Sequence, residues 1–409
     1  MPHGKQPQKD IPELGQHPVE TVPQSFTSLG LGGKILDSIK RVGFENPTPI
    51  QSAVIPPALA GRDVIGLAQT GSGKTAAFVI PIASRLEHGK GLRGLIVCPT
   101  REIALQTKAF LDLFGRPHRL STVCVIGGVK MGPQIKELKD GPDIVVATPG
   151  RLVDHMQRGN VRLNAVEELV LDEADHMLDL GFLPQLNRIL EKIPKRRHTM
   201  MFSATMPPSI ERLARLHLDD PLRIDILPEG RAAEGIEHRL YMVDEYDKKR
   251  CLLALIHQEL GSTLVFTRRK IDADWLCRVL EKEGQPVTNI HSDRTQRERT
   301  DALAGFRGGE HRILVATDIA SRGLDIPGIE HIVNFDIPQT VEEYIHRAGR
   351  TARMDAKGLV STIATWLDKE MVAKIEETIR QPLPRCTVAG VAPYLEVKAR
   401  YLSRRARRR

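Results

Sequence analysis

The stretch Ala68-Gln69-Thr70-Gly71-Ser72-Gly73-Lys74-Thr75 follows the apolar run at 63–67 and precedes an amphipathic helical pattern. Glycines at such a junction let the backbone approach a polyphosphate, and the N–H groups and dipole of the helix start favour an anion. Lys74 can reach the β- and γ-phosphates, and the Thr75 hydroxyl suits Mg²⁺. The alternative is a plain glycine-rich turn, which needs neither the lysine nor the hydroxyl. The stretch therefore predicts a nucleotide-binding P-loop, although Ala68 stands where the general motif has glycine.

Length and composition indicate a two-domain protein of the reducing cytoplasm. The chain has 409 residues, more than one hydrophobic core usually accommodates. It has no run of eighteen apolar residues, and the start of the chain is rich in Pro, Gln and Gly, so we expect neither a membrane span nor a signal peptide. The five cysteines are far apart without a C-x-x-C pair, which argues against a zinc site or a disulfide framework.

Positive charge is concentrated at the C-terminus. The formal net charge is +8, but residues 400–409 contain six arginines and no acid, and the rest of the chain has 53 basic and 51 acidic residues. A basic tail of this kind can hold nucleic acid through phosphate contacts without reading its sequence. A merely solvated terminus is the alternative.

Short apolar runs alternate with helical patterns along most of the chain, which predicts parallel strands in two α/β domains. The rhythm breaks around residues 219–235, where Asp-Asp-Pro and Pro-Glu-Gly are typical of a linker. We expect a disordered leader at 1–24, a first domain at 25–222, a linker at 223–235, a second domain at 236–380 and a basic tail at 381–409. After the P-loop strand, the predicted strands lie at 94–98, 122–126, 143–147, 169–171, 199–202, 263–266, 286–290, 312–316 and 331–334.

An acidic motif, Asp172-Glu173-Ala174-Asp175, directly follows one of these strands. Ligands bind at the carboxyl edge of an open α/β sheet, so Asp172 is placed to hold Mg²⁺. Glu173 is then the candidate to orient and deprotonate the attacking water. An acidic helix cap is the alternative. Ser203 and Thr205, in Ser203-Ala204-Thr205 after the next strand, add two hydroxyls at the same edge.

Together these motifs resemble the DEAD-box RNA helicases, ATP-driven members of helicase superfamily two. The resemblance covers roughly residues 26–366, and the segment 290–296 with the short tail is most similar to the bacterial subgroup called RhlE. It implies two tandem RecA-like domains with a cleft between them, ATP and Mg²⁺ as cofactors, and RNA as partner.

The resemblance adds an adenine site upstream of the P-loop. Phe26, Gly43-Phe44 and Pro47-Thr48-Pro49-Ile50-Gln51 resemble the family's Q motif, in which a glutamine amide reads adenine and an aromatic ring, here Phe44, stacks on the base. An amide both donates and accepts hydrogen bonds, as adenine requires. Gln51 should therefore favour ATP over GTP.

A larger group of residues resembles the family's RNA track. Its members are strand-end threonines, turn glycines and arginines, which can contact sugar and phosphate and should give little base specificity. The track consists of Thr100, Arg101, Gly128, Thr148, Gly150 and Arg151 in the first domain and Thr267, Arg268, Gln296, Arg299, Thr317, Arg322 and Gly323 in the second.

The segment from His346 to Arg353 resembles the family's arginine-finger motif. Arg350 and Arg353 are expected to reach across the cleft to the γ-phosphate, where a guanidinium neutralises charge in the transition state. His346 and Arg347 are expected to couple this segment to Asp175, Ser203 and Thr205, and Asp318 to contact the ribose or to organise the fingers. Ala352 and Ser292 stand where the family usually has glycine, but neither change removes a charged or phosphate-binding group.

Division of the ATPase groups between two domains implies a mechanism. Hydrolysis requires a closed cleft, and a closed track that bends one strand cannot hold a continuous duplex. The expected activity is RNA-stimulated ATP hydrolysis with local, non-processive unwinding or RNA–protein remodelling by a monomer, with ribosomal or decay-machinery proteins as candidate partners.

A DNA-directed translocase and a non-catalytic RNA clamp are the alternatives. The adenine-reading segment and Asp172-Glu173-Ala174-Asp175 disfavour the translocase, while the intact Lys74, Glu173, Arg350 and Arg353 disfavour the clamp.

Overall fold

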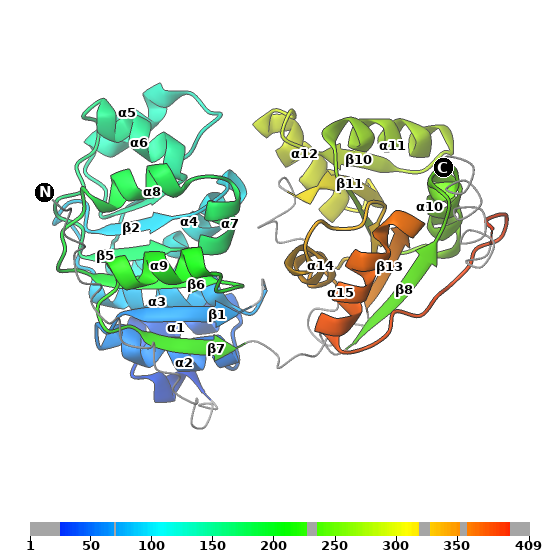
Figure 1. The fold of residues 1–409 in the computed structure, drawn as a ribbon. Coiled ribbons are helices and arrows are strands. Elements are labelled where there is room, and N and C mark those ends of the chain that lie inside the picture. The colour runs from blue at the N-terminus through cyan, green and yellow to red at the C-terminus, as the bar shows by residue number, and fades with distance from the viewer. Residues whose placement is uncertain (1–24, 69–70, 227–234, 319–327, 352–357, 393–409) are drawn as a thin grey trace, which may run out of the picture.

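A computed structural model describes residues 25–68, 71–226, 235–318, 328–351 and 358–392. Within these ranges the chain forms two α/β bodies side by side, each built on a parallel sheet (Figure 1). The predicted α/β fold with two domains is confirmed. No helix in the described ranges has the length and apolar character needed to cross a bilayer.

The first sheet has seven strands in the order β3-β4-β2-β5-β6-β1-β7, and its neighbouring strands pair in parallel. Parallel pairing brings the carboxyl ends of all these strands to one edge, so the P-loop after β1 and the acidic motif after β5 share that edge with β6 between them. The strands are β1 (Val64–Ala68), β2 (Gly94–Val97), β3 (Thr122–Val125), β4 (Ile144–Ala147), β5 (Glu168–Leu171), β6 (His198–Ser203) and β7 (Leu222–Ile226).

Helices cover both faces of the first sheet. One core contains Ile50, Phe78 and Phe114, and the other contains Leu152 and Leu186. Strands buried on both faces read as continuous apolar runs, which is why the sequence revealed them. The helical elements are η1 (Phe26–Leu29), α1 (Gly33–Val42), α2 (Pro49–Leu59), α3 (Lys74–Arg85), α4 (Arg101–Gly115), η2 (Arg116–His118), α5 (Met131–Lys139), α6 (Pro149–Gln157), α7 (Ala174–Asp179), α8 (Leu183–Leu190) and α9 (Pro208–His217).

The second sheet has six parallel strands in the order β10-β11-β9-β12-β13-β8. Its two faces also carry separate cores, because Leu264 and Val265 point to opposite sides of β9. The strands are β8 (Ile236–Met242), β9 (Thr263–Thr267), β10 (Val287–Ile290), β11 (Ile313–Thr317), β12 (His331–Asn334) and β13 (Gly358–Ala364). The helices are η3 (Glu245–Asp247), α10 (Lys248–Gln258), α11 (Lys270–Lys282), α12 (Gln296–Arg307), α14 (Val341–Ala348), η4 (Trp366–Asp368) and α15 (Lys369–Ile379).

The structure moves two of the predicted boundaries. β7 pairs with β1, so the first domain continues to residue 226, inside the expected linker. β7 is an edge strand in which Ile224 is buried while Asp225 is exposed, and it therefore lacks the apolar run used to find strands. Leu383 and Val388 are buried in cores of the second domain, so residues 381–391 belong at least partly to that domain and not to a tail. β8 and β13 were also not expected.

Candidate active site and RNA interface

The P-loop backbone is tightly packed at the start of α3. Gly71 and Gly73 have φ of 87° and 94°, which L-residues rarely adopt. A Cβ at Gly73 would lie 2.5 Å from Nε2 of Gln51, so the loop has no space for a side chain here. The glycines thus let the backbone amides at the start of α3 face a ligand closely.

The polar groups of the loop fit a polyphosphate. Lys74 is buried, and its Nζ donates to the carbonyl of Ala68 at 2.6 Å. Oγ of Ser72 is buried and has no hydrogen-bond partner among the described residues. A lysine ammonium and an unpartnered hydroxyl at a helix start are groups that phosphate oxygens can engage. Thr75 lies half-buried in the first turn of α3, while Thr70 is outside the described residues.

Gln51 connects the predicted adenine site to the P-loop. Its Oε1 accepts from the Thr48 N–H at 3.0 Å, which caps α2, and its Nε2 donates to the Gly73 carbonyl at 3.2 Å. One amide hydrogen therefore stays available for a base. Phe44 instead packs in an aromatic cluster, with ring centroids 6.3–6.5 Å from Phe26, Phe110 and Phe114. Stacking of Phe44 on adenine stays a prediction.

Asp172 and Glu173 lie at the carboxyl end of β5 in a strained turn. Glu173 has φ 48° and ψ 56°, a left-handed conformation at the N-cap of α7. Its N–H donates to Oδ1 of Asp172 at 3.0 Å. Non-glycine residues in this conformation are uncommon and concentrate at functional sites.

The two carboxyl groups have opposite electrostatic character. Burial, and then the charge of Glu173, raise the pKa of Asp172 to about 7. Burial also raises the pKa of Glu173, but the hydrogen bond from His176, the electrostatic interaction with that ring, and the charges of Lys74 and Arg350 together outweigh it and lower that pKa to about 2. The pair thus contains a ready carboxylate base beside a carboxyl group that a cation would ionise.

Asp175 joins the acidic motif to the end of β6. Its Oδ2 accepts from the N–H of Ala204, and from the N–H and hydroxyl of Thr205, at 2.9–3.1 Å. Its own N–H donates to Oγ of Ser203 at 3.3 Å. The structure therefore brings together the three first-domain residues predicted to couple the motifs.

The second domain supplies arginines near this edge. Arg350 is 4% exposed, and its charge is among those that lower the pKa of Glu173, so the two residues interact across the domain boundary. Arg347 differs from expectation: its guanidinium forms a bidentate pair with Asp318 at 2.6 Å and donates to Asn334 at 2.9 Å, both in its own domain. A buried guanidinium needs such planar partners, which β11 and β12 provide at their ends. His346 is half-buried, and Arg353 lies outside the described residues.

The first-domain RNA residues gather where β2, β3 and β4 end. Thr100 and Thr148 are the N-caps of α4 and α6, with Gly150 in the first turn of α6. Arg101 lies against Gly128, where an added Cβ would stand 1.8 Å from its Nη1. Arg151 donates to the carbonyl of Val129 at 3.1 Å. Adjacent strand ends thus place two arginines and two helix starts together.

Some of the second-domain RNA residues also lie at the carboxyl ends of neighbouring strands. Thr267 and Thr317 end the neighbouring strands β9 and β11, and the N–H of Arg268 donates to Asp336 at 2.9 Å. Arg322, Gly323 and the side chain of Gln296 lie outside what the structure describes.

Arg299 and Glu102 form an ion pair between the two domains. Nη2 of Arg299 lies 3.0 Å from Oε1 of Glu102, and their side chains are 14% and 8% exposed. The sequence suggested an RNA contact for Arg299, and sequence reasoning missed this partner because the two residues are far apart in the chain.

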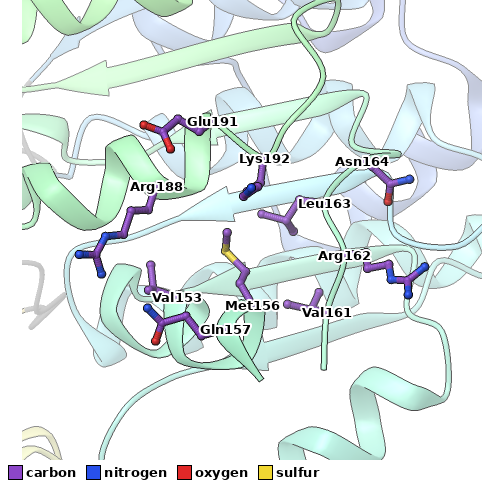
Figure 2. Close-up of a pocket in the computed structure, with 10 residues that line it drawn as sticks. All are labelled: Val153, Met156, Gln157, Val161, Arg162, Leu163, Asn164, Arg188, Glu191 and Lys192. Carbon is purple, nitrogen blue, oxygen red and sulfur yellow. The ribbon is translucent and has the colours of Figure 1, made fainter. Parts of the chain in front are cut away.

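A separate cavity of about 450 Å³ lies between α6 and α8 (Figure 2). Val153, Met156 and Leu163 provide apolar walls, with Arg162 and Arg188 at the rim. None of the residues that line it is a predicted site residue, so the cavity is not part of the nucleotide or RNA site.

His176 is a second residue that sequence reasoning missed. Its Nδ1 lies 3.1 Å from Oε2 of Glu173. The available signal was the i, i+3 spacing, which places two residues on one side of a helical turn.

Comparison with known proteins identifies the family of the chain. Residues 48–213 match the DEAD/DEAH box helicase family, and residues 247–355 match the helicase conserved C-terminal domain. The DEAD-box ATP-dependent RNA helicase RhpA of Helicobacter pylori is 39% identical over 90% of this chain and 76% of its own length. The ATP-dependent rRNA helicase RRP3 of Scheffersomyces stipitis is 40% identical over 94% of this chain and 80% of its own.

A solved structure extends the likeness to both domains. Saccharomyces cerevisiae Dbp5 bound to RNA and ADP BeF3 superposes with a TM-score of 0.81 at 29% identity, over 89% of this chain and 96% of that one. A P-loop, an acidic strand end and an opposing arginine are thus found in a chain that is similar to the RNA helicases RhpA and RRP3. The chain belongs to the DEAD-box family of ATP-dependent RNA helicases.

Proposed function

We propose that this helicase couples ATP hydrolysis to closure of its two domains on an RNA strand. The product of closure is local, non-processive unwinding of short duplexes or remodelling of RNA–protein complexes. The observation that carries the proposal is the contact between the domains: Arg299 pairs with Glu102 at 3.0 Å, and the buried Arg350 of the second domain lies close enough to Glu173 of the first to lower its pKa. An ATPase whose base and arginine lie on different domains is complete only when those domains meet.

Each group then has a defined role. Lys74 binds the β- and γ-phosphates, Glu173 orients and deprotonates the water, and Arg350 and Arg353 stabilise the charge of the transition state. Asp318 fixes Arg347, three residues before Arg350, which supports a role in organising the fingers.

Asp172 and the Thr75 hydroxyl would hold Mg²⁺. No cluster of three or more metal-ligating side chains occurs in the described part of the chain. This fits Mg²⁺, which takes one or two carboxylates together with substrate phosphates and water. The bound ion would neutralise phosphate charge, and the raised pKa of Asp172 marks a carboxyl group that gains from a cation.

RNA binds along the two sets of strand ends through sugar and phosphate. Because ATP and RNA both favour the closed form, each should tighten the binding of the other by the same factor. The five unpaired cysteines support a cytoplasmic site of action. Assignment to the RhlE subgroup, action as a monomer, and ribosomal or decay-machinery proteins as partners are further parts of the proposal, and the rRNA helicase relatives support the ribosomal partners.

Replacement of the base tests the proposal. Glu173→Gln should retain ATP and RNA binding but lose at least about a hundredfold in RNA-stimulated turnover, since general-base catalysis contributes about 10²–10⁴. A long-lived closed complex should accumulate, measured by RNA dissociation in the presence of ATP. Glu191→Gln, an exposed carboxylate of the same domain, is the matched control and should be unaffected. Near-normal turnover of Glu173→Gln would refute the assignment.

A further inference from the structure

His176 is buried directly beside the proposed base. Its side chain is 4% exposed, and Nδ1 lies 3.1 Å from Oε2 of Glu173, three residues earlier. A carboxylate can only accept, so the imidazole must donate from Nδ1.

The other ring nitrogen supports this tautomer. Nε2 of His176 is buried and has no hydrogen-bond partner in the described residues. A hydrogen on Nε2 would be a buried donor without an acceptor, which is unfavourable. With its hydrogen on Nδ1 the ring donates to Glu173, which is its one polar contact among the described residues.

Glu173 is consequently held at several points. Its backbone is in the left-handed conformation at the N-cap of α7, its N–H is bound by Asp172, and Oε2 is bound by His176. Within the described ranges, Oε1 of Glu173 accepts no hydrogen bond from the protein. One carboxylate oxygen is therefore fixed by the protein and the other is left for a ligand.

We propose that His176 is a positioning residue for ATP hydrolysis: by holding Oε2 of Glu173, it fixes Oε1 in the orientation that engages the attacking water. The inference rests on the proposed role of Glu173 as the base. His176 itself makes no contact with ATP in this scheme. If the base is wrongly oriented, ATP hydrolysis slows even though the base itself is unchanged, because catalysis depends on the geometry of the reacting atoms.

Three substitutions separate positioning from packing. His176→Asn keeps an amide donor close to the position of Nδ1, His176→Gln moves the donor toward the position of Nε2, and His176→Phe keeps a ring without a donor. The measurements are RNA-stimulated kcat, KM for ATP, RNA affinity and thermal stability of the full chain. We expect His176→Phe and His176→Gln to lose about tenfold in kcat, with KM and RNA affinity within about twofold, and His176→Asn to recover most of the loss.

The donor position makes the outcome decisive. If folded Asn and Phe variants have the same kcat, whether normal or reduced, His176 acts only in packing and the inference is wrong. In a Glu173→Gln background, His176→Phe should cause no further loss, because residues that act as a unit are not additive. If Glu173→Gln alone keeps its ATP turnover, the proposed function is contradicted. If Glu173→Gln loses turnover but His176→Phe does not, only the positioning role is contradicted.

Discussion

Gly73 shows how one residue fixes the nucleotide site. Its φ of 94° belongs to glycine, and a Cβ would meet the Gln51 side chain at 2.5 Å. The same Gln51 caps α2 and bonds the Gly73 carbonyl, so the adenine-reading helix and the phosphate loop are held as one unit.

We therefore expect Gly73→Ala to weaken ATP binding by about tenfold or more, since the left-handed conformation alone is unfavourable for alanine by about 1–2 kcal/mol. The binding of a fluorescent ATP analogue measures the change. Gly33→Ala is the matched control, because an added Cβ has nothing within 4 Å and its φ is not positive. Equal ATP affinity of the two variants would contradict this account of the loop.

At the level of elements, the second domain contains buried histidines that join its strands to neighbours. Nδ1 of His238 on β8 lies 2.7 Å from the Tyr344 hydroxyl on α14, and Nε2 of His331 on β12 lies 2.8 Å from Oγ of Ser361 on β13. Burial lowers the pKa of both histidines to about 4. Both rings are therefore neutral in the folded protein at neutral pH.

The sign of the pH dependence follows from these shifts. The unfolded chain binds protons at its histidines near pH 6.5, and the folded domain only near pH 4. The free energy of unfolding is therefore highest above about pH 6.5. It falls as the pH drops toward 4, by about 3 kcal/mol per histidine at most. In the double variant His238→Gln, His331→Gln, the free energy of unfolding of the full chain should fall less steeply as the pH is lowered, as measured by calorimetry. The exposed His257→Gln should keep the wild-type slope, and identical slopes for all three proteins would count against the prediction.

At the scale of the whole molecule, the ion pair between Arg299 and Glu102 is a direct contact between the two domains. Both side chains are largely buried at 3.0 Å, so the pair is less screened than an exposed one. It lies among the residues proposed to bind RNA, so it joins the first-domain and second-domain parts of the proposed RNA track.

Arg299→Ala should reduce the factor by which RNA tightens ATP binding by about threefold to tenfold, in the usual range of a coupling free energy. ATP affinity with and without saturating RNA gives this factor. Glu102→Gln should reduce it as well, and the double variant should lose less than the sum of the two single losses. Arg297→Ala removes a neighbouring exposed arginine and should leave the factor unchanged. An unaltered factor in Arg299→Ala would show that the pair does not stabilise closure.

A further prediction at this scale concerns the basic C-terminal residues, which lie outside the described residues. Deletion of 400–409, with its six arginines, should weaken RNA affinity and flatten its dependence on salt, because fewer counterions are released. ATPase activity without RNA should not change. A salt slope equal to that of the full chain would mean that the tail is only solvated.

The sequence alone determined those features that depend on neighbouring residues. The P-loop, the acidic motif and the buried strands such as β2 and β9 were all read from short stretches, because strands buried on both faces are continuous apolar runs and phosphate chemistry needs fixed spacings. The edge strand β7 was missed, since an exposed edge shows alternation with charged residues.

Contacts between residues far apart in the chain became known from the folded structure. It paired Arg299 with Glu102 and Arg347 with Asp318, and it placed Phe44 in an aromatic cluster. Such contacts join residues tens to hundreds of positions apart, and the order of strands in a sheet sets them. The order of strands in a sheet cannot be read from residue spacing along the chain, because the partners of a side chain depend on how separate elements pack together.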